Sequence, residues 1–227
     1  LFLAKGRRPI AISKLAYGEK QQWNQHPQDL QNLVMQTEKR WDMYLTWQTL
    51  ELEISNLSDL MESPVLFLSG KGPLSWTPKH RDLIKEYVNQ GGFLFVENAC
   101  GDVQFDQEFR QAMDELFPDN QLDPLPPDHA IWFADQNISP EFIGKLHGIQ
   151  SCCRTSIVYA TIDLGCYWEL HNPRPDSGIP DSIQQDIQDR LAIGTNVLTY
   201  ATNRQLKEKL ERPQVAFNGT DTTSVLR

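Results

Sequence analysis

The stretch GGFLFVENACGD, residues 91–102, decides the fold. Its two glycines follow a helical pattern and lead into FLFV, a continuous apolar run typical of a strand buried on both faces of a parallel sheet. The run ends in five polar or small residues, Glu97, Asn98, Cys100, Gly101 and Asp102. In open α/β sheets ligands bind beyond the carboxyl ends of the strands, so this tip is the expected place of a site.

The flanking sequence repeats the pattern. SPVLFLSG, residues 63–70, is a second apolar run, and the segment between the two runs predicts a helix with Thr77 as N-cap and Pro78 in its first turn. Asp102 is the predicted cap of the next helix. Further strands are predicted at 10–18, 48–54, 156–160 and 166–170, further helices at 25–41 and from 181 onward, and a long ordered loop at 119–140.

Strands that alternate with helices indicate an α/β fold, with a doubly wound, mainly parallel sheet and helices on both faces. With 227 residues, 40% of them hydrophobic, the chain suits one domain, which we place at residues 9–210. The flanks, 1–8 and 211–227, are expected to be extended or flexible.

Charge and hydropathy exclude some partners. The net charge is −9 and the sequence has no Lys/Arg-rich stripe, which argues against nucleic acid because phosphate-backbone binding depends on cationic side chains. No apolar run approaches the roughly 20 residues of a membrane-spanning helix, so this segment is not expected to insert into a bilayer. The chain begins with Leu, and we expect it to be part of a longer, even membrane-anchored, protein; the sequence assigns no compartment.

Several runs together resemble one family. They are VLFLSGKG, LIKEYVNQGGFLFVENACGD, FDQEFRQAMDELFP, LPPDHAIW and GTNVLTYATNRQL. The sequence is similar, over most of its length, to an uncharacterised bacterial family known only as a domain of unknown function. That family lies near the class I glutamine amidotransferase-like, flavodoxin-like domains. The resemblance implies a flavodoxin-like sheet, with the turn after FLFVE where amidotransferases carry their nucleophile; it implies no reaction.

Four residues are candidates for catalysis at this turn. Cys100 is the candidate nucleophile, His129 and His171 are alternative bases, and Glu97 is the orienting acid. Two features depart from the amidotransferase pattern: Ala99 precedes the cysteine where that family has glycine, and Glu169-Leu170-His171 reverses its His-spacer-Glu order. The alternative for Cys100 is a small buried side chain, and for Glu97 an ion pair with Arg110 or Arg154.

A second set of residues is predicted to bind a ligand. Its members are polar or glycine residues at strand tips and in the proline-rich loop: Ser69, Gly70, Lys71, Asn98, Gly101, Asp102, Asp128 and Arg154. No CxxC pair exists, and no ligand spacing supports a zinc site from Cys100, Cys152 or Cys153, Cys166 and a histidine. The sequence therefore predicts neither a metal nor a cofactor, and plain packing for Cys152-Cys153.

The sequence favours a ligand-binding or assembly module with a degenerate amidotransferase-like crevice, whose partner is a small molecule or a protein. The alternative is a thiol hydrolase that acts on an amide-type substrate through Cys100. The two hypotheses differ in what they require of the turn at residues 97–102: the enzyme needs a base beside the thiol, and the module does not.

Overall fold

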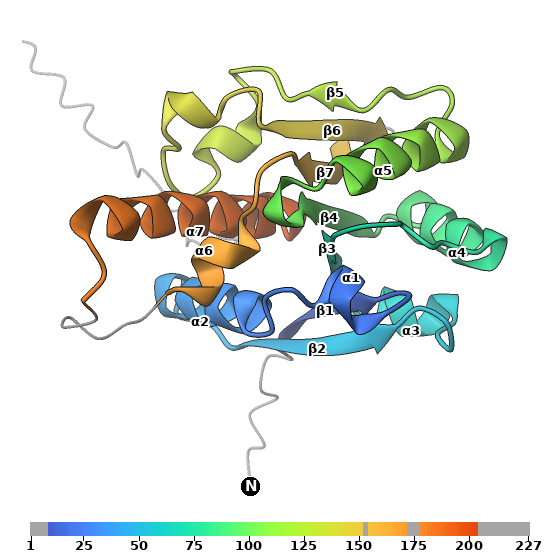
Figure 1. Ribbon diagram of the computed structural model, residues 1–227, viewed down its shortest axis with the longest axis horizontal. Helices are drawn as coiled ribbons and strands as arrows, with labels where there is room; N and C mark the ends of the chain where they lie inside the picture. Colours follow the sequence, from blue (N-terminus) through green and yellow to red (C-terminus); the bar gives the residue numbers. More distant parts are fainter. Residues whose placement is uncertain (1–8, 152–153, 172–177, 204–227) are drawn as a thin grey trace, which may run out of the picture.

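The structure, a computed structural model, describes residues 9–151, 154–171 and 178–203. These residues form a mixed α/β fold around one seven-stranded sheet, in the order β2-β1-β3-β4-β7-β6-β5 (Figure 1). The strands are β1 (Ile10–Ala16), β2 (Leu45–Glu51), β3 (Val65–Gly70), β4 (Phe93–Asn98), β5 (Asp123–Pro124), β6 (Leu146–Ser151) and β7 (Arg154–Ala160).

Helices connect the strands and cover the sheet. They are α1 (Lys20–Trp23), α2 (Asp29–Trp41), α3 (Leu57–Met61), α4 (Pro78–Asn89), α5 (Val103–Leu116), α6 (Gly165–Glu169) and α7 (Asp181–Ala201). Three short 3-10 helices add to them: η1 (Ala99–Gly101), η2 (Ala130–Phe133) and η3 (Pro140–Phe142). Thr77 and Asp102 cap α4 and α5 as predicted, because their side chains accept the backbone N–H of His80 and of Phe105.

The sheet separates two hydrophobic cores. On one face α2, α6, α7 and η2 pack over the side chains of β1, β3 and β4 that point to them, with Trp168 against Phe67 and Phe95. On the other face α3, α4 and α5 cover the alternate residues of the same strands. In Figure 1 the first group of helices lies at the left and the second at the right. Because β3 and β4 are buried on both faces, they need continuous apolar runs, as the sequence showed.

The sheet is mixed: it contains both parallel and antiparallel pairs, whereas the sequence predicted a mainly parallel sheet. The five strands β2, β1, β3, β4 and β7 are parallel, but β6 pairs antiparallel with both β5 and β7. Strand β6, LHGIQS, was not predicted, because its glycine and polar residues have low strand propensity. This strand is held by its pairing with β7, which is a tertiary contact.

Two element predictions need correction. Residues 166–170, predicted as a strand, lie in α6 and the residue after it, with Trp168 buried. A short apolar run reads the same in a buried helix as in a strand, so periodicity could not separate them. The second strand begins at Leu45 rather than residue 48, and Leu52 and Glu53 already lie in the turn that follows it.

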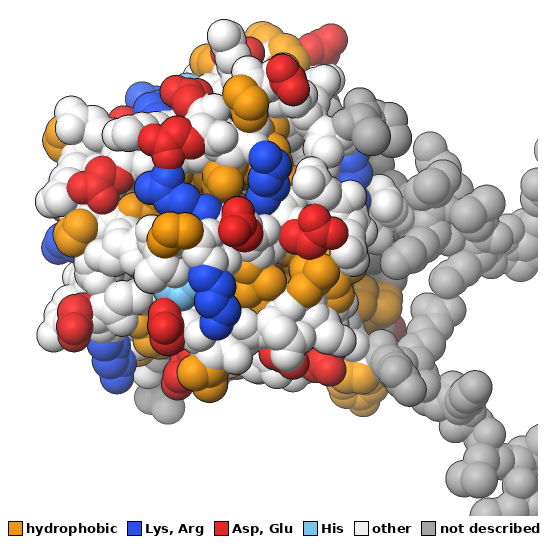
Figure 2. Space-filling view, turned by 90° about the vertical axis from the view of Figure 1, so that its right-hand side faces the viewer, with side chains coloured by type: hydrophobic (Ala, Val, Ile, Leu, Met, Phe, Trp, Pro, Cys, Tyr) orange, Lys and Arg blue, Asp and Glu red, His pale blue; other side chains and the backbone are white. Residues whose placement is uncertain are grey.

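Charges are mixed on the surface that Figure 2 presents, where acidic and basic side chains are interspersed with hydrophobic ones. Among the described helices, including the 21-residue α7, none combines the length and hydropathy needed to cross a bilayer. Cys152-Cys153, the flank 1–8, residues 172–177 and the tail 211–227 lie outside the described residues.

Candidate functional site

Polar side chains converge at the carboxyl edge of the parallel strands. The register places Ser69 of β3 opposite Glu97 of β4, and Glu97 opposite Ala160 of β7. Asp163 follows β7 by three residues, and η1 with Cys100 follows β4 directly. Parallel strands end at the same edge, so these tips meet there.

A buried ion pair forms the floor of the site. Lys14, in the middle of β1, donates from Nζ to both carboxylate oxygens of Asp29 at 2.7 Å. The same ammonium donates to Asn24 Oδ1 at 3.2 Å and to the backbone oxygen of His26 at 3.1 Å. Both charged side chains are almost fully buried. Lys14 therefore has all three of its donors used, and it fixes the loop that carries His26.

Glu97 is fully buried beside this pair. Its Oε2 accepts the backbone N–H of Leu164 at 2.8 Å and of Gly165 at 2.6 Å, at the start of α6. Its Oε1 and the nearby Ser69 Oγ are buried, and neither makes a hydrogen bond of good geometry within the described part of the chain. Burial, and then the neighbouring Asp29 and Asp163 carboxylates, raise the pKa of Glu97 to about 7.

Gly165 allows Glu97 and Asp29 to approach α6. A Cβ at this position would lie 2.4 Å from Glu97 Oε1 and 3.2 Å from Asp29 Oδ2. Any larger residue would therefore push the buried carboxylate away from the α6 backbone. Glu97 pairs with neither arginine considered from the sequence: Arg110 binds Asp106, and Arg154 donates to the backbone oxygens of Gly91 and Ala201.

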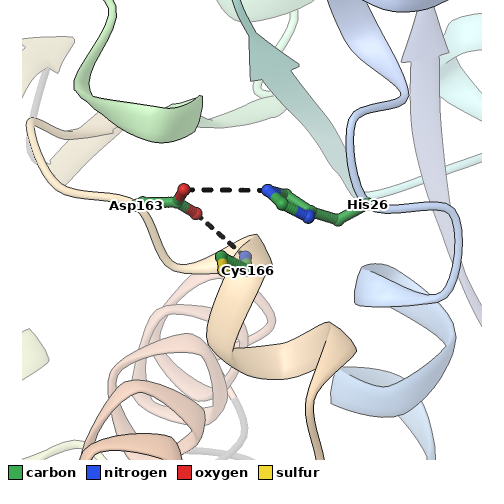
Figure 3. Close-up of side chains that lie close together, drawn as sticks. All are labelled: His26, Asp163 and Cys166. Carbon is green, nitrogen blue, oxygen red and sulfur yellow. Dashed lines mark hydrogen bonds and ion pairs between the residues drawn. The ribbon is translucent and has the colours of Figure 1, made fainter.

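Asp163 contacts three residues at the rim of the site, of which Figure 3 shows His26 and Cys166. Its Oδ2 accepts the backbone N–H of Cys100 at 2.8 Å and lies 3.7 Å from His26 Nε2. Its Oδ1 accepts the backbone N–H of Cys166 at 2.9 Å. Asp163 raises the pKa of His26 against the effect of burial. Burial alone would raise the pKa of Asp163, but His26 and the N–H groups of Cys166 and Cys100 together outweigh it and lower the pKa. His26 and Asp163 thus each favour the charged form of the other.

Cys100 is exposed and has an unusual backbone conformation, with φ of +59°. A non-glycine residue in this left-handed region costs about 1–2 kcal/mol, which the surrounding turn has to supply. Partial burial and the Asp163 carboxylate raise the pKa of the Cys100 thiol, while Lys71 acts weakly in the opposite direction. The thiol is therefore less acidic than an ordinary one, whereas a reactive thiol is usually more acidic.

The remaining strand-tip candidates also lie at this edge, and most have structural contacts. Asn98 is buried at the end of β4, and Asp102 caps α5. Gly70 packs against the ring of Phe105, which a Cβ would overlap at 1.9 Å. Gly101 has a positive φ of +64°. Lys71 is half-buried beside Cys100.

Four predicted residues lie elsewhere. His129 donates or accepts at Thr155 Oγ1, 2.9 Å away, at the amino end of β7. Asp128 next to it is exposed, and Arg154 begins β7 at the same end. His171 contacts Gln36 of α2. The structure therefore brings Cys100 and Glu97 together but places His129, Asp128 and Arg154 at the opposite edge of the sheet.

From the sequence, Cys166 was considered only for a zinc site that no ligand spacing supports, and four further residues of the site were not candidates: Lys14, His26, Asp29 and Asp163. Two of them carried a usable signal. Lys14 is a charge inside an apolar strand, and Asp163 follows a strand's carboxyl end, as Glu97 does. His26, Asp29 and Cys166 come from a loop and from the starts of two helices, so only the fold brings them to this edge.

Comparison with protein families gives one match. A family described as a domain of unknown function, DUF4159, matches residues 11–202. The chain belongs to the DUF4159 family. The match spans every element from β1 to α7, and so includes all residues of the site. Among curated proteins, none matches this DUF4159 chain.

Two solved structures are similar to it at low identity. A protein described as ThuA-like, from Bacteroides uniformis ATCC 8492, is 11% identical with a TM-score of 0.48, over 87% of this chain and 93% of the other. An oxidoreductase from Corynebacterium diphtheriae is also 11% identical, with a TM-score of 0.39, over 86% of this chain and 98% of the other.

Proposed function

We propose that this DUF4159 chain is a binding module whose site lies at the carboxyl edge of β4 and β7, and that the site takes a positively charged ligand. In this proposal the edge is a degenerate amidotransferase-like crevice, and Cys100 does not act as a nucleophile. The ligand is a small cation or the cationic group of a larger molecule, including a partner protein in an assembly.

The strand order supports the proposed relation to flavodoxin-like and amidotransferase-like sheets. The parallel strands follow the order β2-β1-β3-β4-β7, which is the order of flavodoxin-like doubly wound sheets. Such sheets bind ligands at a switch point where the order reverses, between β1 and β3. Lys14, Ser69 and Glu97 belong to β1, β3 and β4, at or next to that point.

One observation carries the proposal: Asp163 contacts both the backbone of Cys100 and the ring of His26. A nucleophilic cysteine needs an imidazole as its immediate neighbour, with the carboxylate behind it. Here the carboxylate is the neighbour and raises the pKa of the thiol. The same carboxylate makes the rim favourable for a cation.

The thiol hydrolase remains the second candidate because of one feature. Cys100 is exposed on a tight strand-to-helix turn with a left-handed backbone, as nucleophiles on such turns are. Alkylation separates the two candidates. We expect Cys100 to react slowly with iodoacetamide at pH 7, and Asp163→Asn to accelerate its labelling, as followed by mass spectrometry. Rapid labelling of wild-type Cys100 well below pH 8 would instead support the hydrolase.

Cation binding is tested by thermal unfolding with Mg²⁺, Zn²⁺ and putrescine as probes. A ligand that binds only the folded state raises the melting temperature with its concentration. We expect at least one of the probes to stabilise the wild type but not Asp163→Asn. Asp123→Asn, which removes an exposed carboxylate on β5, is the matched control. If no probe stabilises the wild type, or if Asp163→Asn responds equally, the proposal is wrong.

A further inference from the structure

We propose that His26, Asp163 and Cys166 bind a transition-metal ion of the Zn²⁺ class. This inference rests on the proposed function and names its ligand. The three residues come from the loop after β1, the loop after β7 and the first turn of α6, and Figure 3 shows their side chains on facing sides of one small space. No spacing motif joins them, so the sequence alone gave no metal site.

The distances suit one ion. One ligand atom from each residue, the His26 ring nitrogen, an Asp163 oxygen and Cys166 Sγ, lies within 4.8 Å of the other two. Ligand atoms around a tetrahedral Zn²⁺ are roughly 3.3–3.7 Å apart, given bond lengths of about 2.0–2.3 Å. His26 Nε2 and Asp163 Oδ2 are already 3.7 Å apart. Binding therefore needs the ligand atoms to approach one another by up to about 1.5 Å.

The His26 ring supplies an independent observation. Its Nε2 is shielded from solvent, yet it has no hydrogen-bond partner in the described part of the chain. The 3.7 Å to Asp163 is too long for a hydrogen bond. Histidine is the commonest metal ligand among side chains, so an ion between this ring and Asp163 would give Nε2 a direct partner.

Neighbouring groups hold the three ligands in place. Asp163 is oriented by the N–H groups of Cys100 and Cys166, at 2.8 and 2.9 Å. Lys14 holds the backbone oxygen of His26 at 3.1 Å, and Glu97 binds the N–H groups at the start of α6, next to Cys166. Ligands of protein metal sites are usually oriented in this way by a surrounding shell of hydrogen bonds.

The donor set selects the kind of metal. One imidazole nitrogen, one carboxylate oxygen and one thiolate suit Zn²⁺ or Co²⁺, whereas Mg²⁺ and Ca²⁺ require oxygen ligands. Three protein ligands leave a fourth position for water or a further ligand. On binding, the His26 ring and the Cys166 thiol each release a proton to solvent, and Asp163 exchanges its imidazolium partner for the ion.

The alternative is a simple ion pair between His26 and Asp163, with Cys166 as a bystander. Cobalt titration tells the two apart, because thiolate bound to Co²⁺ gives a charge-transfer band in the near ultraviolet and an ion pair gives none. The wild-type chain should show this band, saturate at one ion per chain, and lose Co²⁺ to added Zn²⁺. Cys166→Ser should abolish the band, and His26→Gln should weaken binding by at least about 100-fold, beyond the usual effect of a supporting residue.

Three variants serve as controls. The double variant Cys152→Ser/Cys153→Ser removes the other cysteine pair, and His147→Gln removes a histidine of β6; both should bind as the wild type does. Cys100→Ser should bind more tightly than Cys166→Ser. Circular dichroism of each metal-free variant checks that it is folded.

The outcomes separate this inference from the proposed function. If Mg²⁺ or putrescine stabilises the wild type while Co²⁺ gives no thiolate band, the metal site is wrong and a cation site stands. A band that persists in Cys166→Ser and disappears in Cys152→Ser/Cys153→Ser also overturns the inference. If no cation binds at all, both proposals fail.

Discussion

The polar residues at the two edges of the parallel sheet have different kinds of partner. At the amino edge His129 bonds Thr155 and accepts the N–H of Ile131, and Arg154 donates to two backbone oxygens. At the carboxyl edge three carboxylates, Asp29, Glu97 and Asp163, share a small volume with Lys14 and His26. Polar side chains at the amino edge therefore have neutral or backbone hydrogen-bond partners. At the carboxyl edge, the three carboxylates outnumber the two basic side chains.

This difference shows in the pKa values. Burial lowers the pKa of His129, and the Asp128 carboxylate only partly offsets it, so the folded chain favours the neutral ring. Glu97, by contrast, has a pKa raised to about 7 by burial and by two further carboxylates. A side chain whose charge changes near pH 7 is typical of binding or catalytic sites, whereas a neutral, hydrogen-bonded side chain is typical of packing. The following predictions test that contrast, beginning with the largest effect.

Lys14→Met should destabilise the chain most. The substitution leaves Asp29 buried without its ammonium, and breaking a buried pair in this way costs about 3–5 kcal/mol. Urea denaturation measures the loss. Adding Asp29→Leu should recover part of it, because an apolar pair needs no compensation. Arg81→Met, which breaks the exposed pair with Glu115, is the control and should cost far less, because solvent screens an exposed pair.

Glu97→Gln should flatten the dependence of stability on pH. The native carboxyl keeps its proton to about pH 7, whereas the unfolded one releases it near pH 4.5, the ordinary pKa of a glutamate. The folded chain therefore binds more protons in this window, and the free energy of unfolding falls as pH rises through it, by up to about 3 kcal/mol. Urea denaturation at pH 5.5 and 8 measures the slope, and an equal slope in both proteins would refute the prediction.

His129→Gln should have a smaller effect of opposite sign. Since the pKa of folded His129 lies below its ordinary value of 6.5, its contribution is complete above that pH and is lost as pH falls. The variant should lose about 1 kcal/mol at pH 8 through its hydrogen bonds, and less at pH 5.5. The rate of Cys100 alkylation, measured alongside, should not change. A change would mean that the two edges are coupled.

Much of the fold was predictable because its signals are local. The apolar runs at 65–70 and 93–98 and the caps Thr77 and Asp102 identify elements by their own residues. The predictions that were wrong concern segments whose structure depends on tertiary contacts. Strand β6 is held by its pairing with β7, and α6 is helical although its apolar residues would equally suit a strand. Intrinsic propensity is a weak guide for such segments.

The site divides in the same way. The sequence by itself determined that the tip of residues 97–102 lies at the carboxyl edge, because any strand followed by a helix in a parallel sheet ends there. Only the tertiary structure decided its neighbours. His26 is far along the chain from Asp163 and Cys166, and the three meet because the loop between α1 and α2 and the connection from β7 to α6 lie at one edge, while His129 lies at the other. Strand position follows from local pattern, but proximity between loops follows from the packing of the whole sheet.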